Sequence, residues 1–539
     1  MPNRPDTDAL IIGAGVAGTL LACGLARKGL RVLLVEAGPE INRAEAVRRF
    51  QTAYPKVPEC AYPLSAFSPH PTTDKIDDFY VQKGPDLFRS TYLKQVGGTT
   101  WHWLGTAVRL VPDDFVLQSK FGRGVDWPVG YAALEPWYAA AERELGVSGD
   151  STDDLGSPRS GPYPLPLLAQ SYLDQFWIKA LAGSQYRVSA TPQARLSRPE
   201  EGRPACCGSA SCIPICPVQA KYDASIHAAR ARSLGVQLRS QTVVTRIEIG
   251  DDRLAKAVHY RCPDGSSGRI SARCIVVAAN AIETPRLLLS SATDQSPAGV
   301  ANSSDQVGRN LMDHPVQLSW ALARDPVFPY RGPGSTSGIE GPRAVQSRNL
   351  RSALRLEIGN DGWSWPTGAP LDTARRFSLE GLRGAVLEQA LREQASRHLR
   401  IAALSEQLPD PDNRITLDPL LRDGSGMARP AIHYHIDAYT RQGLDAARGI
   451  HTELFQRLGA TDIQHFQTAQ GAGHILGTAC MGNDPAHSVV DANLRSHDHA
   501  NLFLVGGAVF PTGGTGNPTL TIAALALRAT DAIAATAAA

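Results

Sequence analysis

The strongest constraint on the fold comes from residues 8–37, DALIIGAGVAGTLLACGLARKGLRVLLVEA, which predict a strand, a turn, a helix and a second strand. The turn reads Gly13-x-Gly15-x-x-Gly18. One glycine makes the tight turn, one lets the backbone approach a pyrophosphate, and one lets the helix pack on the strand. Glu36 ends the second strand, about 20 residues after Gly15, where a carboxylate can hold ribose hydroxyls. The unit predicts a Rossmann-type dinucleotide-binding domain.

Two distant segments favour FAD over NAD, because they resemble further pieces of one split cofactor site. Residues 97–103, GGTTWHW, predict a loop whose backbone passes close to a flat ring; an ordinary turn before a buried tryptophan pair is the alternative. Residues 501–533 contain a buried strand, LFLVGG, then a loop rich in glycine and proline, then a helix that opens near Pro518. This second strand–loop–helix unit again directs a helix N-terminus at a ligand.

Four of the nine cysteines cluster in the run PACCGSASCIPICPVQAKY. The spacing Cys207-x4-Cys212-x3-Cys216, followed by proline, resembles a thiolate cradle for an iron–sulfur cluster, and three ligands suit a 3Fe–4S cluster. Cys206 is either a fourth ligand or a spare. Structural zinc and disulfides are the alternatives, but paired Cys-x2-Cys knuckles are missing, and a large core has little need of disulfides. The scattered cysteines are expected to be small buried hydrophobes: Cys23, Cys60, Cys262, Cys274 and Cys480.

Length and composition set the remaining bounds. A chain of 539 residues is too long for one core, so at least two domains are expected. The formal net charge of +2 and the lack of a basic run argue against a nucleic-acid partner. The last apolar stretch is interrupted by Arg528 and Asp531, so we expect an amphipathic helix and no membrane span. Because the first strand begins near Asp8, no leader is expected, which predicts a cytoplasmic protein or one exported with a partner.

Five motifs together resemble the glucose–methanol–choline (GMC) oxidoreductase family. They are the GxGxxG…E unit, GGTTWHW, AANAIETPRLLL (278–289), NSSDQVGRNLMDHP (302–315), and HILGT with the GNPTLTIAALALR tail. The cysteine run narrows the resemblance to the catalytic subunits of bacterial FAD-dependent sugar and polyol dehydrogenases, the group acting on glucose, fructose, sorbitol and gluconate. The resemblance implies an α/β protein in which a Rossmann-type FAD-binding domain carries an α+β substrate domain built on an antiparallel sheet.

The resemblance also assigns site residues. His474 matches the family's catalytic histidine and Asn517 matches its hydroxyl-positioning partner; a neutral imidazole suits a base near pH 7. Sugar dehydrogenases of this group usually carry asparagine before that histidine, and Gly473 here removes a polar group beside the substrate, so glucose is not assumed. Further flavin contacts are expected from Gly98, Thr99 and His102, from Val243 and Val244 at the adenine, and from Gly507 and Ala508. Many relatives carry aspartate at position 507.

Other histidines are given structural roles. The histidine of a THW run is bonded covalently to FAD in the related pyranose oxidases; His102 lies in WHW, and we expect non-covalent binding. His314 in MDHP is expected in a structural turn. His487, His497 and His499 are expected at the solvated surface.

The family pattern divides the chain into five segments. These are an FAD-binding part (1–115), a connecting segment (116–200), a second FAD-binding part with the cysteines (201–319), a substrate-binding domain (320–465) and a C-terminal FAD-binding part with the catalytic pair (466–539). In 320–465 we expect charged helices such as LRGAVLEQALREQASRHLRIAAL and substrate-domain strands such as RPAIHYHID.

The predicted function is an FAD-dependent dehydrogenase that oxidises a sugar or polyol hydroxyl and passes electrons through an iron–sulfur cluster. By resemblance, the partners are a multihaem cytochrome c subunit and a small subunit with a twin-arginine signal, which together place the protein on the periplasmic side of the inner membrane; a cytoplasmic location is the alternative. Two other functions stay open: an oxygen-using carbohydrate oxidase of the GMC or pyranose-oxidase type, and a non-catalytic flavin electron-transfer subunit.

Overall fold

Strands from three distant parts of the chain meet in one seven-stranded sheet. The computed structural model describes residues 5–53, 80–361 and 371–539. The sheet runs in the order β5-β2-β1-β8-β7-β6, and β17 pairs in parallel with β8. Its strands are β1 (Thr7–Ile12), β2 (Val32–Val35), β5 (Gln237–Arg239), β6 (Val243–Ile249), β7 (Ala255–Arg261), β8 (Ser267–Val277) and β17 (Leu502–Leu504). The parallel strands β1, β2 and β17 are buried throughout, as expected for short apolar runs covered on both faces.

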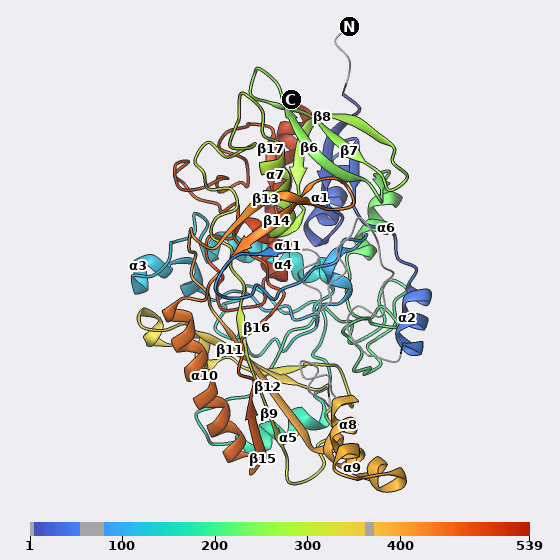
Figure 1. Cartoon of the computed structure of the whole chain (residues 1–539), viewed down its shortest axis with the longest axis vertical. Coiled ribbons are helices and arrows are strands. Elements are labelled where there is room, and N and C mark those ends of the chain that lie inside the picture. Colours follow the sequence, from blue (N-terminus) through green and yellow to red (C-terminus); the bar gives the residue numbers. More distant parts are fainter. Residues whose placement is uncertain (1–4, 54–79, 362–370) are drawn as a thin grey trace.

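Helices cover this sheet in the upper half of the molecule, where both termini lie (Figure 1). α1 packs on α11 and α6, and α11 packs on α4. The bounds are α1 (Val16–Arg27), α4 (Tyr131–Leu145), α6 (Ser225–Ser233), α7 (Asn280–Ser290) and α11 (Thr519–Ala538). α11 is long and apolar enough to cross a membrane by length and composition, yet most of its apolar window is buried inside the protein. α11 is therefore a core helix of the protein, packed against α1 and α4.

The second sheet lies in the lower half of Figure 1 and is mainly antiparallel. Its order is β15-β9-β12-β11-β10-β4, with β16 also paired to β9. The bounds are β4 (Ser189–Ala190), β9 (Pro315–Leu322), β10 (Ser337–Ile339), β11 (Leu354–Gly359), β12 (His398–Ser405), β15 (Thr461–His465) and β16 (Gln470–Gly471). Ile401 and Ala403 belong to the core under α10 (Ala438–Arg457) and α5 (Tyr172–Ala180), whereas Ala402 and Leu404 face a large cavity. The alternation of a strand thus separates core from cavity.

Two segments of the region predicted as substrate domain differ from expectation. RPAIHYHID contributes β14 (Ala428–His433), which pairs with β13 (Arg414–Arg422) and β3 (Val81–Gln82) beside α7, away from the second sheet. The charged stretch predicted to be helical forms α9 (Gly384–Arg397) only in part. Its last residues form the buried strand β12. Pairing with β9 and β11 on both sides outweighs the local helical pattern there.

Shorter elements complete the chain. α8 (Leu371–Leu379) and α9 form a helical pair at the bottom of Figure 1. The others are α2 (Arg43–Thr52), α3 (Leu117–Phe121), and the single-turn helices η3 (Gly98–Trp101), η4 (Pro112–Phe115), η5 (Gly341–Arg343), η6 (Gln346–Asn349) and η8 (Gly507–Val509). They lie in the connections between the longer helices and strands.

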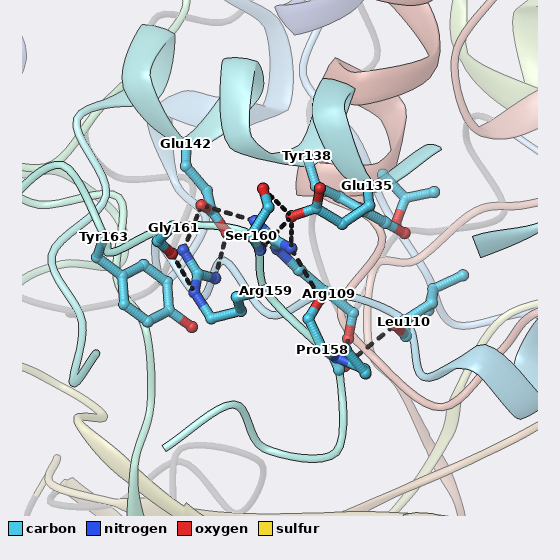
Figure 2. Close-up of polar contacts among 12 residues, drawn as sticks. Arg109, Leu110, Glu135, Tyr138, Glu142, Pro158, Arg159, Ser160, Gly161 and Tyr163 are labelled. Atoms are coloured by element: carbon cyan, nitrogen blue, oxygen red, sulfur yellow. Dashed lines mark hydrogen bonds and ion pairs between the residues drawn. The ribbon is translucent and has the colours of Figure 1, made fainter. Parts of the chain in front are cut away.

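A buried ionic network fastens α4 to the loops beside it (Figure 2). Arg109 Nε donates to Glu142 Oε1 at 2.9 Å, and Arg159 Nη2 donates to Glu142 Oε2 at 2.7 Å. Arg109 also pairs with Glu135 at 2.8 Å. Glu142 is 1% exposed, so the two guanidinium groups supply the opposite charge that its burial requires.

Candidate active site and cysteine cavity

One cavity of about 750 Å³ lies between the two sheets and gathers most of the predicted cofactor residues. The predicted residues that line it are Gly13, Gly15, Glu36, Gly98, Thr99, His102, Val243, Val244, Gly507, His474 and Asn517. Gly18 and Ala508 lie behind the lining. Segments from the start, the middle and the end of the chain therefore meet around one long space of the size that a dinucleotide needs.

The glycine turn has the geometry that its spacing predicts. A Cβ at Gly13, whose φ is +106°, would lie 2.5 Å from the Ala278 carbonyl oxygen, and a Cβ at Gly18 would lie 2.0 Å from the Gly13 oxygen. A Cβ at Gly15 would meet no atom within 4 Å, because that position opens into the cavity at the start of α1. Gly13 and Gly18 thus serve close packing, and Gly15 leaves room for a phosphate at the helix N-terminus.

Glu36 is held rigidly at the edge of the cavity. Its carboxylate accepts hydrogen bonds from the backbone N–H groups of Ala14, at 2.8 Å, and Gly38, at 2.9 Å. Burial raises the pKa of Glu36 to about 6, against the lowering effect of those N–H groups. The same carboxylate therefore supports the glycine turn and lines the nucleotide end of the cavity.

The GGTTWHW segment folds as a tight turn against the glycine loop. A Cβ at Gly98 would lie 3.2 Å from Gly15 Cα. The indole N–H of Trp101 donates to the Val96 carbonyl at 2.8 Å, and that of Trp103 donates to the Tyr222 carbonyl at 2.8 Å. The segment combines the two predicted alternatives, a turn held by tryptophans and a loop beside a ligand. The tryptophans anchor the turn, and the backbone of the turn lines the cavity.

His474 and Asn517 are brought together at the other end of the cavity, although 43 positions separate them. Asn517 Nδ2 lies 3.4 Å from His474 Nε2. Asn517 Oδ1 accepts a hydrogen bond from Arg355 Nη1 at 3.2 Å, which directs the amide N–H groups toward His474. Burial lowers the pKa of His474 well below its usual value, and the nearby His314 and Arg355 lower it further. The imidazole is therefore neutral at pH 7.

His314 contacts and orients the imidazole of His474, which corrects its expected role in a structural turn. His314 Nε2 lies 3.1 Å from the Gly514 carbonyl oxygen, which can only accept, so this nitrogen carries the proton. His314 Nδ1 is then an acceptor, and it lies 3.0 Å from His474 Nδ1, which must donate. His474 Nε2 is thereby left with its lone pair facing Asn517 and the cavity. The MDHP motif carried this residue, but sequence alone did not place it against His474.

Asp313 and Arg355 are two further residues that sequence reasoning did not identify. Asp313 Oδ1 accepts from the backbone N–H of His474 at 3.0 Å and of His314 at 2.7 Å, and burial raises the pKa of Asp313 to about 6. Arg355 pairs with Glu340 at 3.0 Å and also contacts Glu357. Both are isolated charged residues in apolar strands or turns, a pattern that predicts burial with a partner but not which partner.

The substrate end of the cavity carries a polar set on the second sheet. Glu357, Asp361 and Arg400 line it, and Arg400 Nε donates to Asp361 Oδ1 at 2.9 Å. Carboxylate and guanidinium groups beside the apolar Leu318 and Leu404 can bind the hydroxyl groups of a polyhydroxylated molecule.

The four clustered cysteines line a second, small cavity together with Arg195 and Lys221. Cys212 and Cys216 are buried, Cys206 is half-buried and Cys207 is exposed. Three residues of the same loop, Ala210, Ile213 and Pro214, line the large cavity instead. The loop therefore forms the wall between the two cavities.

Neither zinc nor a disulfide fits the cysteines of the described ranges. Within those ranges, no three His, Cys, Asp or Glu side chains converge on a single metal position, and every cysteine described is a free thiol. Four thiols and two cations line this small cavity, whose volume is about 10 Å³. Among the scattered cysteines, Cys23, Cys274 and Cys480 are buried as predicted, Cys262 is half-buried, and Cys60 lies outside the described residues.

The three histidines expected at the surface have different environments. His487 is exposed, as predicted, and pairs with Asp484 at 2.8 Å. His497 is half-buried and contacts Ser488. His499 is buried, which contradicts the prediction, because its Nδ1 contacts the Arg253 carbonyl at 2.8 Å and its Nε2 accepts from the Ala301 N–H at 3.3 Å. It joins the loop before β17 to the loops around it.

Comparison with known proteins supports the same assignment. Residues 170–316 and 409–526 match the two models of the GMC oxidoreductase family, and residues 8–110 match a model of FAD dependent oxidoreductases. The fructose dehydrogenase large subunit of Gluconobacter japonicus is 38% identical over 98% of this chain and 97% of its own length. The 2-methyl-1,2-propanediol dehydrogenase of Mycolicibacterium austroafricanum is 29% identical, with 98% and 96% covered.

A solved structure shows the same fold at lower identity. Pyridoxine 4-oxidase from Mesorbium loti superposes with a TM-score of 0.62 at 20% identity, covering 98% of this chain and 99% of its own.

Proposed function

The chain belongs to the GMC oxidoreductase family, and from that premise we propose that it is the flavoprotein subunit of a sugar or polyol dehydrogenase that delivers electrons through an iron–sulfur cluster. FAD-dependent oxidation of a CH–OH group follows from the family and from its dehydrogenase relatives. The observation that carries the catalytic assignment is the lone pair of His474 Nε2, which is held beside the Asn517 amide at the cavity wall.

The protein groups divide the reaction between them. The large cavity would hold FAD, which would supply the hydride acceptor for the carbon that carries the substrate hydroxyl. His474 Nε2 takes the hydroxyl proton, and the oxidised carbon becomes a carbonyl. Asn517 Nδ2 orients the substrate oxygen, and Arg355 holds the amide in the required orientation. His314 keeps the proton of His474 on Nδ1, so that Nε2 is ready to receive another.

Two features support an iron–sulfur cluster in the cysteine cavity. The small cavity is lined by thiols that form no disulfide within the described residues. The loop that carries them also forms part of the wall of the large cavity. When bound there, a cluster supplies transfer of electrons one at a time. We propose Cys207, Cys212 and Cys216 as the ligands on their spacing in the chain, with Cys206 a fourth ligand or a spare; all four line the small cavity.

The names of two relatives describe parts of sugar dehydrogenases: the large subunit of fructose dehydrogenase, and the gluconate 2-dehydrogenase flavoprotein of Pantoea cypripedii, which is 24% identical. On the family resemblance, we propose that this chain works beside a cytochrome c-type subunit and a small subunit bearing a twin-arginine signal, on the periplasmic side of the inner membrane.

The catalytic assignment is tested by anaerobic flavin reduction with a panel of sugars and polyols. We expect His474→Ala to slow flavin bleaching by about 10²- to 10⁴-fold with the FAD content unchanged, because a general base contributes that much. His487→Ala, which alters an exposed histidine, is the control. Unchanged bleaching in His474→Ala would remove the proposed base and favour a non-catalytic electron-transfer subunit.

The relay is tested by iron content and low-temperature EPR of the purified protein, before and after substrate. We expect iron and a signal that changes on substrate addition, lost in Cys212→Ser and retained in Cys262→Ser, which alters a cysteine outside the small cavity. Fully flavinated, active protein without iron would exclude the relay. Rapid peroxide formation in that protein would instead favour the carbohydrate oxidase.

A further inference from the structure

Arg195 and Lys221 are buried cations for which the described part of the chain supplies no carboxylate partner. Each is 1% exposed, and each lines the cysteine cavity. Among the described residues, neither belongs to an ion pair. The six other buried arginines of the described residues all pair with carboxylates: Arg109, Arg286, Arg343, Arg348, Arg355 and Arg400. The fold therefore compensates buried positive charge elsewhere and leaves it uncompensated beside the cysteines.

The contacts of the two side chains satisfy hydrogen bonds but not charge. Lys221 Nζ donates to the backbone carbonyls of Trp101, at 2.9 Å, Trp103, at 2.5 Å, and Cys212, at 2.8 Å. Arg195 Nη2 donates to the Leu104 carbonyl, whereas its buried Nε and Nη1 find no partner within the described residues. Carbonyl oxygens are neutral, so these hydrogen bonds leave both side chains without a compensating charge among the described residues.

The carboxylate with the clearest influence on Lys221, Asp223, is already matched. Asp223 forms a buried ion pair with Arg43 and accepts hydrogen bonds from the hydroxyl and N–H of Ser225. The remaining candidates for negative charge are the thiols themselves, which carry it as thiolates when they bind metal.

We propose that Arg195 and Lys221 are the counter-charges of an iron–sulfur cluster held in this cavity, so that they govern both its retention and its reduction potential. The proposal rests on the cluster proposed above. A cluster held by thiolates is an anion in a low-dielectric space, and each added electron makes it more negative. Two fixed cations stabilise the reduced form more than the oxidised form, and they therefore raise the potential.

Lys221 has a second consequence for the relay. Its ammonium joins the Trp101–Trp103 backbone, which belongs to the turn lining the flavin cavity, to the Cys212 backbone. One side chain thus fixes the position of the cysteine loop relative to the flavin turn. Electron transfer between two cofactors requires such fixed spacing.

The test replaces each cation with a neutral hydrogen-bonding side chain, Arg195→Gln and Lys221→Gln, in the full chain. We expect a lower iron-to-FAD ratio, and a more negative midpoint potential of the remaining cluster in an EPR-monitored redox titration. Arg195→Lys and Lys221→Arg keep the charge and should stay near wild type. Arg198→Gln removes an exposed cation of the same segment and should change neither quantity.

The outcomes separate this proposal from the one it rests on. If the wild-type protein contains no iron, the cluster itself is wrong. If wild type holds the cluster and both glutamine variants match it in iron content and potential, the counter-charge role is wrong. FAD content and thermal unfolding report on folding. Lys221 donates to three backbone carbonyls, so Lys221→Gln is the variant more prone to unfold. Arg195→Gln loses a hydrogen bond to only one carbonyl, and it tests the counter-charge role if Lys221→Gln does not fold.

Discussion

At the scale of single residues, the catalytic end of the cavity is a chain of hydrogen bonds with one consistent direction. Gly514 fixes His314, His314 fixes His474, and Arg355 fixes Asn517. The Gly514 carbonyl can only accept a hydrogen bond, so it fixes which nitrogen of His314 donates, and His314 in turn fixes which nitrogen of His474 donates. The result is one imidazole nitrogen without a proton at the place where a substrate hydroxyl can reach it.

We predict that His314→Leu lowers kcat about tenfold to a hundredfold while FAD stays bound. The change deletes a buried acceptor of the His474 Nδ1 proton, which leaves His474 free to adopt the tautomer with Nε2 protonated. His314→Asn returns an acceptor near the same point and should recover much of the loss. Equal activity in His314→Leu and wild type would show that the tautomer is set elsewhere.

The lowered pKa of His474 also predicts the acid limb of activity. The group works as a base when it is unprotonated, so activity is present above its pKa and is lost as pH falls through it. We expect kcat/KM for flavin reduction to stay flat from neutral pH to below the ordinary imidazole range. His314→Leu removes one cause of the lowering, so its acid limb should move to higher pH. A wild-type limb centred near 6.5 would contradict this.

At the scale of elements, helix α4 depends on a buried carboxylate (Figure 2). Glu142 pairs with Arg109 and Arg159, and all three side chains are almost fully buried. Breaking such a group from one side leaves charges in the interior without compensation.

We expect Glu142→Gln to lower the free energy of unfolding by about 3–5 kcal/mol in urea denaturation. Glu388→Gln is the matched control, because Glu388 pairs with Arg392 on the exposed face of α9. Exposed pairs of this kind contribute at most about 1 kcal/mol. Similar losses in the two variants would mean that burial does not decide the energy of these pairs.

At the scale of the whole molecule, buried histidines make the fold sensitive to acid. Burial lowers the pKa of His314 and His398 to about 4 and that of His451 to about 3. Since the unfolded chain binds their protons near 6.5, their contribution to stability is present above that pH and is lost as pH falls toward the folded values. Glu36 and Asp313, whose pKa values are raised to about 6, act in the opposite direction between about 6 and 4.

The histidine shifts are larger and begin at higher pH, so we expect thermal stability to decline as pH is lowered from 7 to 5. His451→Gln, remote from the large cavity, should reduce that slope, because one buried imidazole no longer needs to remain neutral. The melting temperature measured across this pH range tests the expectation. A slope unchanged in the variant would assign the acid sensitivity to other groups.

The sequence by itself determined the parts whose evidence is local. The spacing of Gly13, Gly15 and Gly18 and the apolar strands beside them are enough to define a dinucleotide unit, since Gly13 and Gly18 permit close packing and Gly15 leaves open space. The motifs that carry the family resemblance likewise predicted FAD and selected His474 and Asn517, which the structure brings into contact. Cysteines close in sequence were bound to be close in space.

Only the tertiary structure decided which distant residues meet. His314 was expected in a turn, and it became the partner of His474 because β9 and the segment after β16 lie side by side. His499, Arg195 and Lys221 look like ordinary polar residues in the chain, and their burial arises from elements remote in sequence. β12 forms a strand where the local pattern is helical, because two neighbouring strands supply its hydrogen bonds. Partners, burial and charge compensation depend on long-range packing, which local spacing does not specify.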